Sequence, residues 1–301
     1  MNAPLNNAAN LMLACVITLI PVIANASTLE RVQTGQSLTL GFLPDFAPFS
    51  TQEGDKASGY GIDLCLKVVD KVKNELGLPS LQVRYQPLKI NEEVDAISTG
   101  KVDIVCTPTL ATLERRKIVN FSIPIYTAGL SVVVRKNAPA GLLKILNGQV
   151  DKTGPAWRAS VNRGLANMTY ATVAGSVIDR WVRDQLRALG VTVTRVTVED
   201  ANAGLKLVAN GKADAFFAER MVLTHILDNT YPDKSLVLLD RIFDYSPTAM
   251  MVERDDERFR LLVDTALSEM YRSGEIELAY DRHLGGVSDT TRKLFKLYAL
   301  P

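Results

Sequence analysis

Two short stretches, GKVDIVC (Gly100–Cys106) and GKADAFF (Gly211–Phe217), decide the fold. Each opens with a Gly-Lys turn and continues with an aspartate that leads into a hydrophobic strand. Strand and helix patterns alternate on both sides of each stretch, so we interpret the two as corresponding points of a repeat. The repeat predicts two α/β units of similar order within one chain.

The surrounding pattern gives the elements of each unit. In the first unit we expect strands at 37–42, 81–85 and 103–106 and helices at 62–76 and 91–98. In the second we expect strands at 130–134, 170–173, 191–198, 214–217 and 236–239 and helices at 176–189 and 200–209. A strand at 249–252 and helices at 257–271 and 291–298 follow. This order predicts mixed, mostly parallel sheets with helices on both faces.

Composition and charge exclude several classes of protein. The chain has 301 residues, 47% of them hydrophobic and 22% charged, which is ordinary for a globular protein with a sizeable core. Its formal net charge is +1, so we expect no nucleic-acid partner. The sequence contains no nucleophile elbow, metal-ligand cluster or phosphate-binding loop, and we expect neither a cofactor nor a metal.

The N-terminus is typical of a secretory signal peptide. An apolar run at 11–23 is too short to span a bilayer comfortably, and the small-x-small site Ala24-Asn25-Ala26 follows it. We therefore predict cleavage after Ala26 and a periplasmic mature protein. The segment 1–10 contains no lysine or arginine, which leaves two alternatives, an uncleaved membrane anchor and a start codon assigned upstream of the true one.

Two cysteines remain after cleavage, Cys65 and Cys106. Cys65 lies in the first turns of an expected helix and Cys106 at the C-terminal end of an expected strand. In a parallel α/β sheet these ends share one edge, so the thiols can meet there. A disulfide is favoured in an exported protein, with two separate buried thiols as the alternative.

Six stretches resemble a known family in its own order over nearly the whole mature chain. They are GFLPDFAPFS (Gly41–Ser50), GYGIDLCLKVVDKV (Gly59–Val72), GKVDIVCTPTLATLERRKIVNFSIPIY (Gly100–Tyr126), VAGSVIDRWVRDQL (Val173–Leu186), GKADAFFAERMVL (Gly211–Leu223) and LSEMYRSGEIELAYDRHLG (Leu267–Gly285). The chain resembles the family 3 bacterial extracellular solute-binding proteins, which bind amino acids for ABC importers. It looks most like the branch that contains the glutamate/aspartate-binding proteins.

The resemblance implies a two-lobed periplasmic-binding-protein fold of type II, hinged by two crossover strands. Lobe 1 would comprise residues 27–123 and 246–301, and lobe 2 residues 124–245. A small amino-acid-like ligand would bind between the lobes, which close over it. The partners implied are this ligand and a membrane permease, with the binding protein itself a monomer.

The family motif places two charged ligand-binding residues in this chain. Arg115 matches the arginine that holds the ligand carboxylate, for which a planar guanidinium is suited. Glu219 matches the aspartate that binds the ammonium group, with one more methylene. The alternatives are a solvated Arg115 beside Arg116 and a surface Glu219 paired with Arg220.

Further ligand contacts are expected in both lobes. Gly175 and Ser176 begin a helix whose N–H groups and hydroxyl can bind a carboxylate, although Ser176 is also a plausible simple N-cap. Phe46 matches an aromatic residue that covers the ligand in relatives. Thr107 and Thr109 supply hydroxyls in the loop after the third strand.

Departures from the family pattern bear on the ligand. Pro108 and Leu110 stand where relatives have hydroxyl residues. Acidic-amino-acid binders place arginines where this chain has Leu43 and, less securely aligned, Glu93. We therefore expect a neutral or cationic ligand rather than glutamate or aspartate, with Glu93 favouring a cation.

Two other functions stay open at this point. The same fold has given rise to cyclohexadienyl and arogenate dehydratases, and in such an enzyme Glu219 would act as a general acid. A sensor that reports ligand to a membrane receptor is the other. The sequence indicates no role for the segment 137–163.

Overall fold

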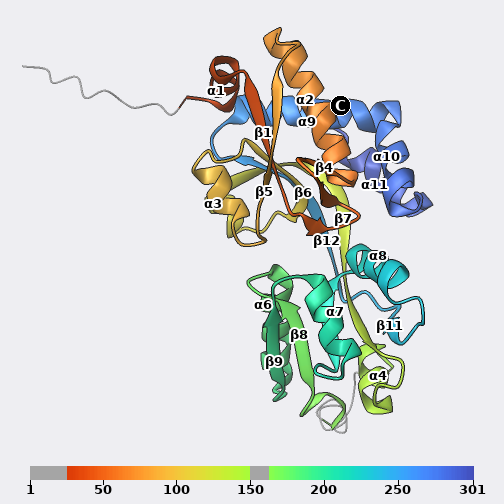
Figure 1. The fold of residues 1–301 in the computed structure, drawn as a ribbon. Helices are drawn as coiled ribbons and strands as arrows, with labels where there is room; N and C mark the ends of the chain where they lie inside the picture. Colours follow the sequence, from red (N-terminus) through yellow and green to blue (C-terminus); the bar gives the residue numbers. More distant parts are fainter. Residues whose placement is uncertain (1–25, 150–162) are drawn as a thin grey trace, which may run out of the picture.

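The computed structural model describes residues 26–149 and 163–301. The predicted signal peptide, apart from Ala26, lies outside the described residues, as does the part 150–162 of the segment 137–163. The chain forms two lobes, one above the other in Figure 1, with two strands running between them. No helix among the described residues is both long enough and apolar enough to cross a membrane.

The first part of the chain builds the upper lobe. Its elements are α1 (Thr28–Gly35), β1 (Ser37–Phe42), β2 (Asp45–Phe46), β3 (Ser50–Glu53), β4 (Lys56–Ser58), α2 (Tyr60–Leu76), β5 (Gln82–Pro87), α3 (Glu93–Ser98), β6 (Ile104–Leu110) and the short 3-10 helix Arg115–Lys117. The chain then leaves this lobe along β7 (Val119–Arg135).

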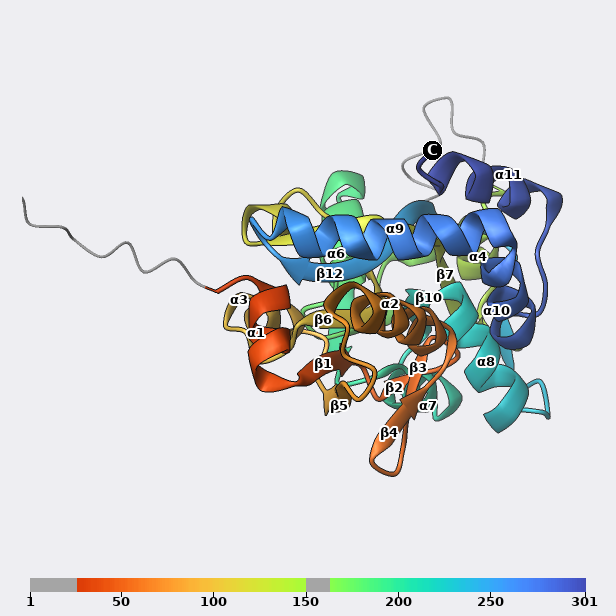
Figure 2. The same ribbon diagram turned by 90° about the horizontal axis from the view of Figure 1, so that it is seen from above.

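The lower lobe follows, and the C-terminal helices return to the upper one. The lower-lobe elements are α4 (Ala140–Leu146), β8 (Thr169–Val173), α6 (Val177–Leu189), β9 (Thr194–Val198), α7 (Ala201–Ala209), β10 (Ala215–Glu219), α8 (Arg220–Thr230) and β11 (Leu236–Leu238). The return runs along β12 (Asp244–Glu253) to α9 (Glu257–Ser273), α10 (Glu275–Leu284) and α11 (Asp289–Tyr298). Viewed from above, α9 lies alongside α2, with α10 and α11 at its C-terminal end (Figure 2).

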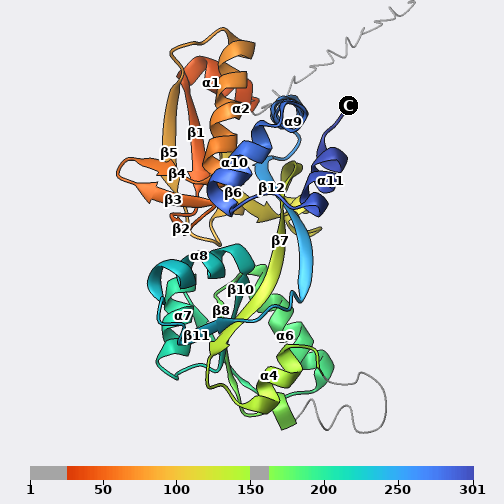
Figure 3. The ribbon, with the colours of Figure 1, turned by 90° about the vertical axis from the view of Figure 1, so that its right-hand side faces the viewer.

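The sheet confirms the predicted α/β fold with helices around it and shows how the lobes are joined. The strand order is β5-β1-β6-β12-β7-β10-β8-β9, and β11 pairs with β7. The pairs β1 with β6 and β8 with β10 are parallel, whereas β7 is antiparallel to β10, β11 and β12, and β12 is antiparallel to β6. A separate antiparallel sheet consists of β2, β3 and β4. The two lobe sheets are therefore continuous through β7 and β12, which Figure 3 shows running from one lobe to the other.

Strand β7 is much longer than the expected strand 130–134, because it includes the whole crossover. Its pairing with β12 extends from Val119 opposite Glu253 to Leu130 opposite Asp244, with a register shift near Pro124. A proline cannot donate a ladder hydrogen bond and is tolerated at such an irregularity. The predicted lobe boundaries, after Ile123 and after Tyr245, lie within β7 and β12.

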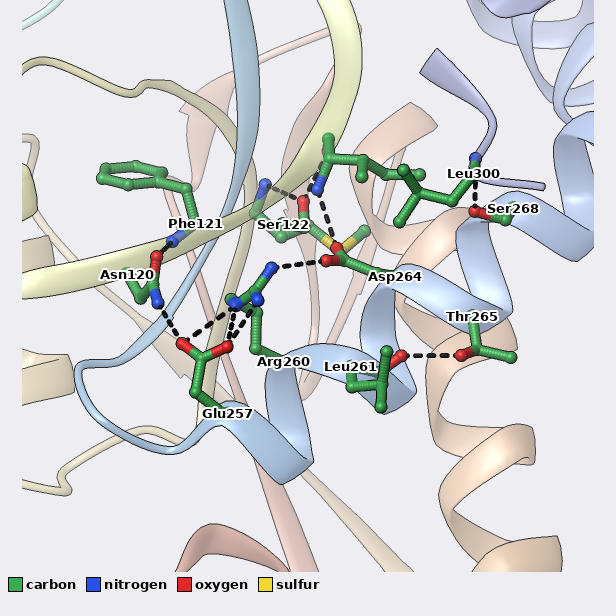
Figure 4. A network of polar contacts seen from close by, with 12 residues as sticks. Asn120, Phe121, Ser122, Glu257, Arg260, Leu261, Asp264, Thr265, Ser268 and Leu300 are labelled. Atoms are coloured by element: carbon green, nitrogen blue, oxygen red, sulfur yellow. Dashed lines mark hydrogen bonds and ion pairs between the residues drawn. The ribbon is translucent and has the colours of Figure 1, made fainter.

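Helix α9 fixes the upper part of β7 in lobe 1 (Figure 4). The buried Asp264 carboxylate accepts a hydrogen bond of 2.7 Å from the Ile123 N–H and one of 2.8 Å from Arg260. Asn120 donates to Glu257 at 2.9 Å. Burial raises the pKa of Asp264, and the Ile123 N–H and Arg260 oppose that rise. Bending between the lobes is therefore expected below Ile123.

The structure confirms the predicted disulfide. Cys65 in α2 and Cys106 in β6 are bonded, with their Cα atoms 5.7 Å apart. Gly61 permits this approach, because a Cβ at that position would collide with the carbonyl oxygen of Cys106. The start of α2 is thus joined to the strand that leads into the cleft.

Candidate ligand-binding cleft

A cavity of about 490 Å³ lies between the lobes, with a lining drawn from both lobes and from the crossover strands. This volume is within the range of roughly 300–1,000 Å³ that is typical of small-molecule sites. Among the predicted site residues, the lining includes Phe46, Glu93, Thr109, Arg115, Ser176 and Glu219. The structure therefore brings the two charged candidates, Arg115 and Glu219, to one cavity.

Arg115 stands in the 3-10 helix that follows β6, and its side chain is 18% exposed. Its Nη1 atom donates to the Leu110 carbonyl at 3.2 Å, and its Nη2 atom lies 3.7 Å from Glu93 Oε2. The side chain is therefore held at the cavity wall rather than in bulk water. A guanidinium has five N–H donors, and these two contacts leave donors for a ligand carboxylate.

Glu93 at the start of α3 is 2% exposed and lies next to Arg115. Thr109 donates its hydroxyl to Glu93 Oε1 at 2.8 Å. Burial raises the pKa of Glu93, and the Arg115 charge and the Thr109 hydrogen bond oppose that rise. The carboxyl thus offsets part of the positive charge that Arg115 brings to the cavity.

Glu219 closes β10 and caps the N-terminus of α8. Its Oε2 accepts from the Val222 N–H at 2.9 Å, while its Oε1 accepts from the Tyr126 hydroxyl at 3.1 Å and the Gly129 N–H at 3.4 Å. Burial raises the pKa of Glu219 to about 7, although these donors oppose the rise. Arg220 instead donates to the Leu239 carbonyl at 2.8 Å, so Glu219 is not the surface partner of Arg220.

The N-terminus of α6 also faces the cavity. Ser176 is its N-cap, and the hydroxyl accepts from the Asp179 N–H at 3.0 Å. Ser176 therefore acts as a simple cap and lies at the cavity wall at the same time. The first free N–H groups of the helix and its dipole are available to an anionic ligand group there.

Two predicted ligand contacts lie elsewhere. Thr107 is fully buried and outside the lining, because its hydroxyl accepts from the Leu43 N–H at 2.9 Å and bonds Ser50 Oγ at 2.7 Å. Gly175 is also outside the lining and has a φ of +68°, with Asn91 packed against it. Thr107 thus fastens the loop after β1, and Gly175 forms a contact between the lobes.

Two polar contacts join the lobes beside the cavity. Asn91 donates its Nδ2–H to the Ala174 carbonyl at 3.2 Å, and Arg180 forms an ion pair with Glu114. Asn91 and Glu114 belong to lobe 1, whereas Ala174 and Arg180 belong to the α6 region of lobe 2. The structure therefore shows the lobes in contact along this edge.

Aromatic residues surround the Glu219 end of the cavity. The Phe46 and Phe49 ring centroids are 5.8 Å apart, and Phe49 and Tyr126 are 4.7 Å apart. All three residues line the cavity, and Tyr126 donates to Glu219. Such a group of rings around a carboxylate suits a cationic group. The sequence pattern missed Tyr126, because nothing in its spacing reveals a partner 93 residues away.

The lining carries more acidic than basic side chains. Six carboxylates line it, namely Asp45, Glu93, Glu199, Asp200, Glu219 and Asp244. Two cationic side chains accompany them, Lys89 and Arg115. Apart from Glu93 and Glu219, these acids were not recognised from the sequence, because isolated surface-type carboxylates carry no motif. The cavity as described is electrostatically suited to a ligand without excess negative charge.

Comparison with known proteins agrees with this architecture. Residues 38–286 match the family model of the bacterial extracellular solute-binding proteins, family 3. An L-glutamate/L-aspartate-binding protein of Pseudomonas aeruginosa is 28% identical over 267 residues, covering 87% of this chain and 82% of the relative. The arginine-binding extracellular protein ArtP of Bacillus subtilis is 25% identical over 273 residues, covering 89% and 93%.

A solved structure shares the fold. It is an ancestral amino acid-binding protein described as a precursor of cyclohexadienyl dehydratase. The TM-score is 0.68 at 23% identity, and the match covers 86% of this chain and 99% of the other. At this identity the likeness supports the fold.

Proposed function

The chain belongs to the bacterial extracellular solute-binding proteins, family 3, and we propose that it captures an amino acid between its lobes for an ABC importer. The observation that carries the proposal is the presence of Arg115 and Glu219 in one cavity. Arg115 comes from the loop before β7, and Glu219 from the far end of β10. A zwitterion needs a fixed cation and a fixed anion when both of its charges leave water.

The ligand's α-carboxylate is assigned to Arg115 and the N-terminus of α6 at Ser176. Its ammonium group is assigned to Glu219, with Tyr126 and Phe46 around it. Each lobe then supplies part of both interactions, so binding favours the closed arrangement of the lobes. The Asn91 contact with Ala174 stabilises that arrangement.

We propose a neutral or cationic side chain for the ligand rather than an acidic one. Leu43 lines the cavity where the acidic-amino-acid binders have an arginine. Glu93 is buried beside Arg115 and would repel a second ligand carboxylate. The relative from Pseudomonas aeruginosa binds glutamate and aspartate, so this chain is proposed to differ from it in specificity.

The proposal also covers export, cellular location and oligomeric state. The family is extracellular by description, which supports export of this chain by the predicted signal peptide with cleavage after Ala26. We propose that the mature protein is a periplasmic monomer that delivers its ligand to a membrane permease. Intact-mass measurement of protein from the periplasm tests the cleavage site, and light scattering tests the monomer.

Calorimetric titration of the purified protein tests ligand binding. The panel comprises L-arginine, L-glutamine, L-alanine, L-phenylalanine, L-glutamate and L-aspartate. We expect saturable binding of neutral or basic members and at least tenfold weaker binding of the two acidic ones. Binding is expected to disappear in Arg115→Gln and Glu219→Gln. The matched controls Arg116→Gln and Glu75→Gln lie outside the cavity and should leave it intact. Tight aspartate binding would overturn the proposed specificity.

The family is one of binding proteins, which agrees with the expectation that the chain is not an enzyme. One observation favours the dehydratase alternative, because a buried carboxyl with a pKa of about 7 can act as a general acid. Incubation with prephenate and arogenate, followed by product absorbance, distinguishes the two functions. A sensor role would instead require a membrane receptor as the partner. Affinity capture with the immobilised protein tests whether it binds the permease or a receptor ectodomain.

A further inference from the structure

A large part of the cavity wall is apolar and lies next to the groups assigned to the ligand carboxylate. Helix α6 contributes Val177, Ile178 and Trp181 to it. Trp181 follows Ile178 by three residues and Val177 by four, so it shares a helix face with each of them, and all three line the cavity. The helix therefore presents an apolar stripe to the ligand space immediately after its N-cap.

The stripe is held in place by aromatic packing at Trp181. The Trp181 and Phe243 rings lie 5.8 Å apart in an edge-to-face arrangement, as do the Phe243 and Phe217 rings. Arg241 lies over the Phe243 ring at 4.7 Å. Trp181 is thus held by a series of packed aromatic rings, which limits its movement.

The same wall continues to the ammonium end. Phe217 and Glu219 are two residues apart on β10, so their side chains point to one face of the sheet. Leu130 of β7 is paired with Glu219 and also lines the cavity. An apolar path therefore leads from Glu219 through Leu130 and Phe217 toward Trp181.

Lobe 1 supplies the facing wall. Ile90 and Leu110 line the cavity, and each stands close in sequence to a residue that contacts the α6 region. Asn91 donates to Ala174, and Glu114, four residues after Leu110, pairs with Arg180. These contacts join the lobe 1 loops to the α6 region, and Ile90 and Leu110 line the same cavity as Ile178 and Trp181. We call the part of the cavity lined by these four residues the slot.

We propose that this slot, between Ile90 and Leu110 of lobe 1 and Ile178 and Trp181 of lobe 2, binds an apolar side chain of the ligand. The inference rests on the proposed function and narrows it to amino acids that carry a branched alkyl or aryl side chain. A purely polar ligand would leave the apolar walls in contact with water, whereas an alkyl or aryl group displaces that water.

Titration of matched probes tests the slot. L-Alanine and L-phenylalanine have the same backbone charges and differ by one aryl group. We expect phenylalanine to bind at least tenfold more tightly than alanine. Trp181 serves as a local reporter once Trp157, which lies outside the described residues, is replaced in a W157F background. Its emission is expected to change on addition of phenylalanine.

The variant Ile178→Ser makes the slot polar without removing a group assigned to the ligand backbone. It should abolish the phenylalanine advantage and leave alanine affinity within about twofold. Leu261→Ser, an apolar-to-polar change at an exposed site on α9, is the matched control and should change neither affinity. Circular dichroism checks that both variants are folded, and Ile178→Val provides a conservative second variant that should retain the advantage.

The outcomes of these titrations distinguish failure of the slot proposal from failure of the proposed amino-acid binding. Equal affinities for alanine and phenylalanine, or an advantage that survives Ile178→Ser, would overturn the slot and leave the proposed function standing. Binding of arginine or glutamine without binding of alanine or phenylalanine would also overturn the slot and leave the proposed function standing. Failure of every amino acid in the panel to bind would overturn the proposed function, and the slot with it.

Discussion

Replacement of Glu219 by glutamine is predicted to stabilise the ligand-free protein at alkaline pH while abolishing ligand binding. The carboxyl is 8% exposed, and burial raises its pKa from 4.5 to about 7. A carboxyl with a raised pKa binds its proton more tightly in the folded chain than in the unfolded chain. The free energy of unfolding therefore falls as the pH rises from about 4.5 to about 7, and is constant above that.

The size of this effect follows from the two pKa values. Their difference, at 1.36 kcal/mol for each pH unit, corresponds to about 3 kcal/mol. The glutamine loses one acceptor for Tyr126 or Gly129, at a cost of about 1 kcal/mol. We therefore expect Glu219→Gln to be about 2 kcal/mol more stable than the wild type at pH 8.

Urea unfolding at pH 5 and pH 8 provides the assay. The stability difference between variant and wild type should grow by about 2–3 kcal/mol from pH 5 to pH 8, and the hydrogen-bond cost cancels in this comparison. Glu75→Gln, an exposed control, should show no such growth. A stability difference that is independent of pH would refute the argument that burial in the cleft raises the pKa of Glu219.

Three further predictions concern the cleft. Affinity for a cationic ammonium group should fall as the pH drops below about 7, because Glu219 becomes protonated, and titrations in buffers of different ionisation enthalpy should show proton release on binding at neutral pH. Gly175→Ala should displace the Asn91 amide and break its hydrogen bond to the Ala174 carbonyl, which weakens binding in calorimetric titrations by about fivefold, or about 1 kcal/mol. Gly190→Ala, which has a similar positive φ and open space around it, controls for backbone strain and should leave the affinity unchanged. Thr107→Val should lower the free energy of unfolding by about 2 kcal/mol in urea titrations, because the buried Leu43 N–H loses its acceptor, and a loss of binding without a loss of stability would contradict that role.

The repeat around Asp103 and Asp214 was sufficient to predict the two α/β units, because each aspartate begins a hydrophobic strand after a turn. Both carboxylates accept backbone N–H groups of a neighbouring strand, from Thr39 at 2.8 Å and from Thr169 at 2.8 Å. The repeat in sequence thus reflects the same interaction in each lobe. A turn followed by an aspartate and a hydrophobic strand involves only neighbouring residues, so it can be recognised from the sequence.

The crossover strand was harder to predict. Residues 119–129 combine buried, half-buried and proline positions, since β7 leaves one lobe and enters the other. A strand that passes through such different environments has no single period of apolar and polar residues, so the sequence pattern does not reveal it. The strand expected at 191–198 begins later, at Thr194, because the Val191 N–H donates to Leu186 and completes the end of α6.

The sequence predicted the charged residues of the candidate site and several of its polar and aromatic lining residues. Arg115, Glu219 and Glu93 follow from the motif and its departures, and all three reach the cavity. Thr107, predicted as a ligand-binding residue, lies outside the cavity lining, and its hydrogen-bond partner was not evident from the sequence. That partner, the Leu43 N–H, lies 64 residues away.

The most direct test is a crystal structure of the mature protein isolated with its own ligand. We predict an amino acid in the cleft, with its carboxylate hydrogen-bonded to Arg115 and its ammonium group to Glu219. A ligand seated elsewhere, with neither side chain in contact with it, would contradict the account.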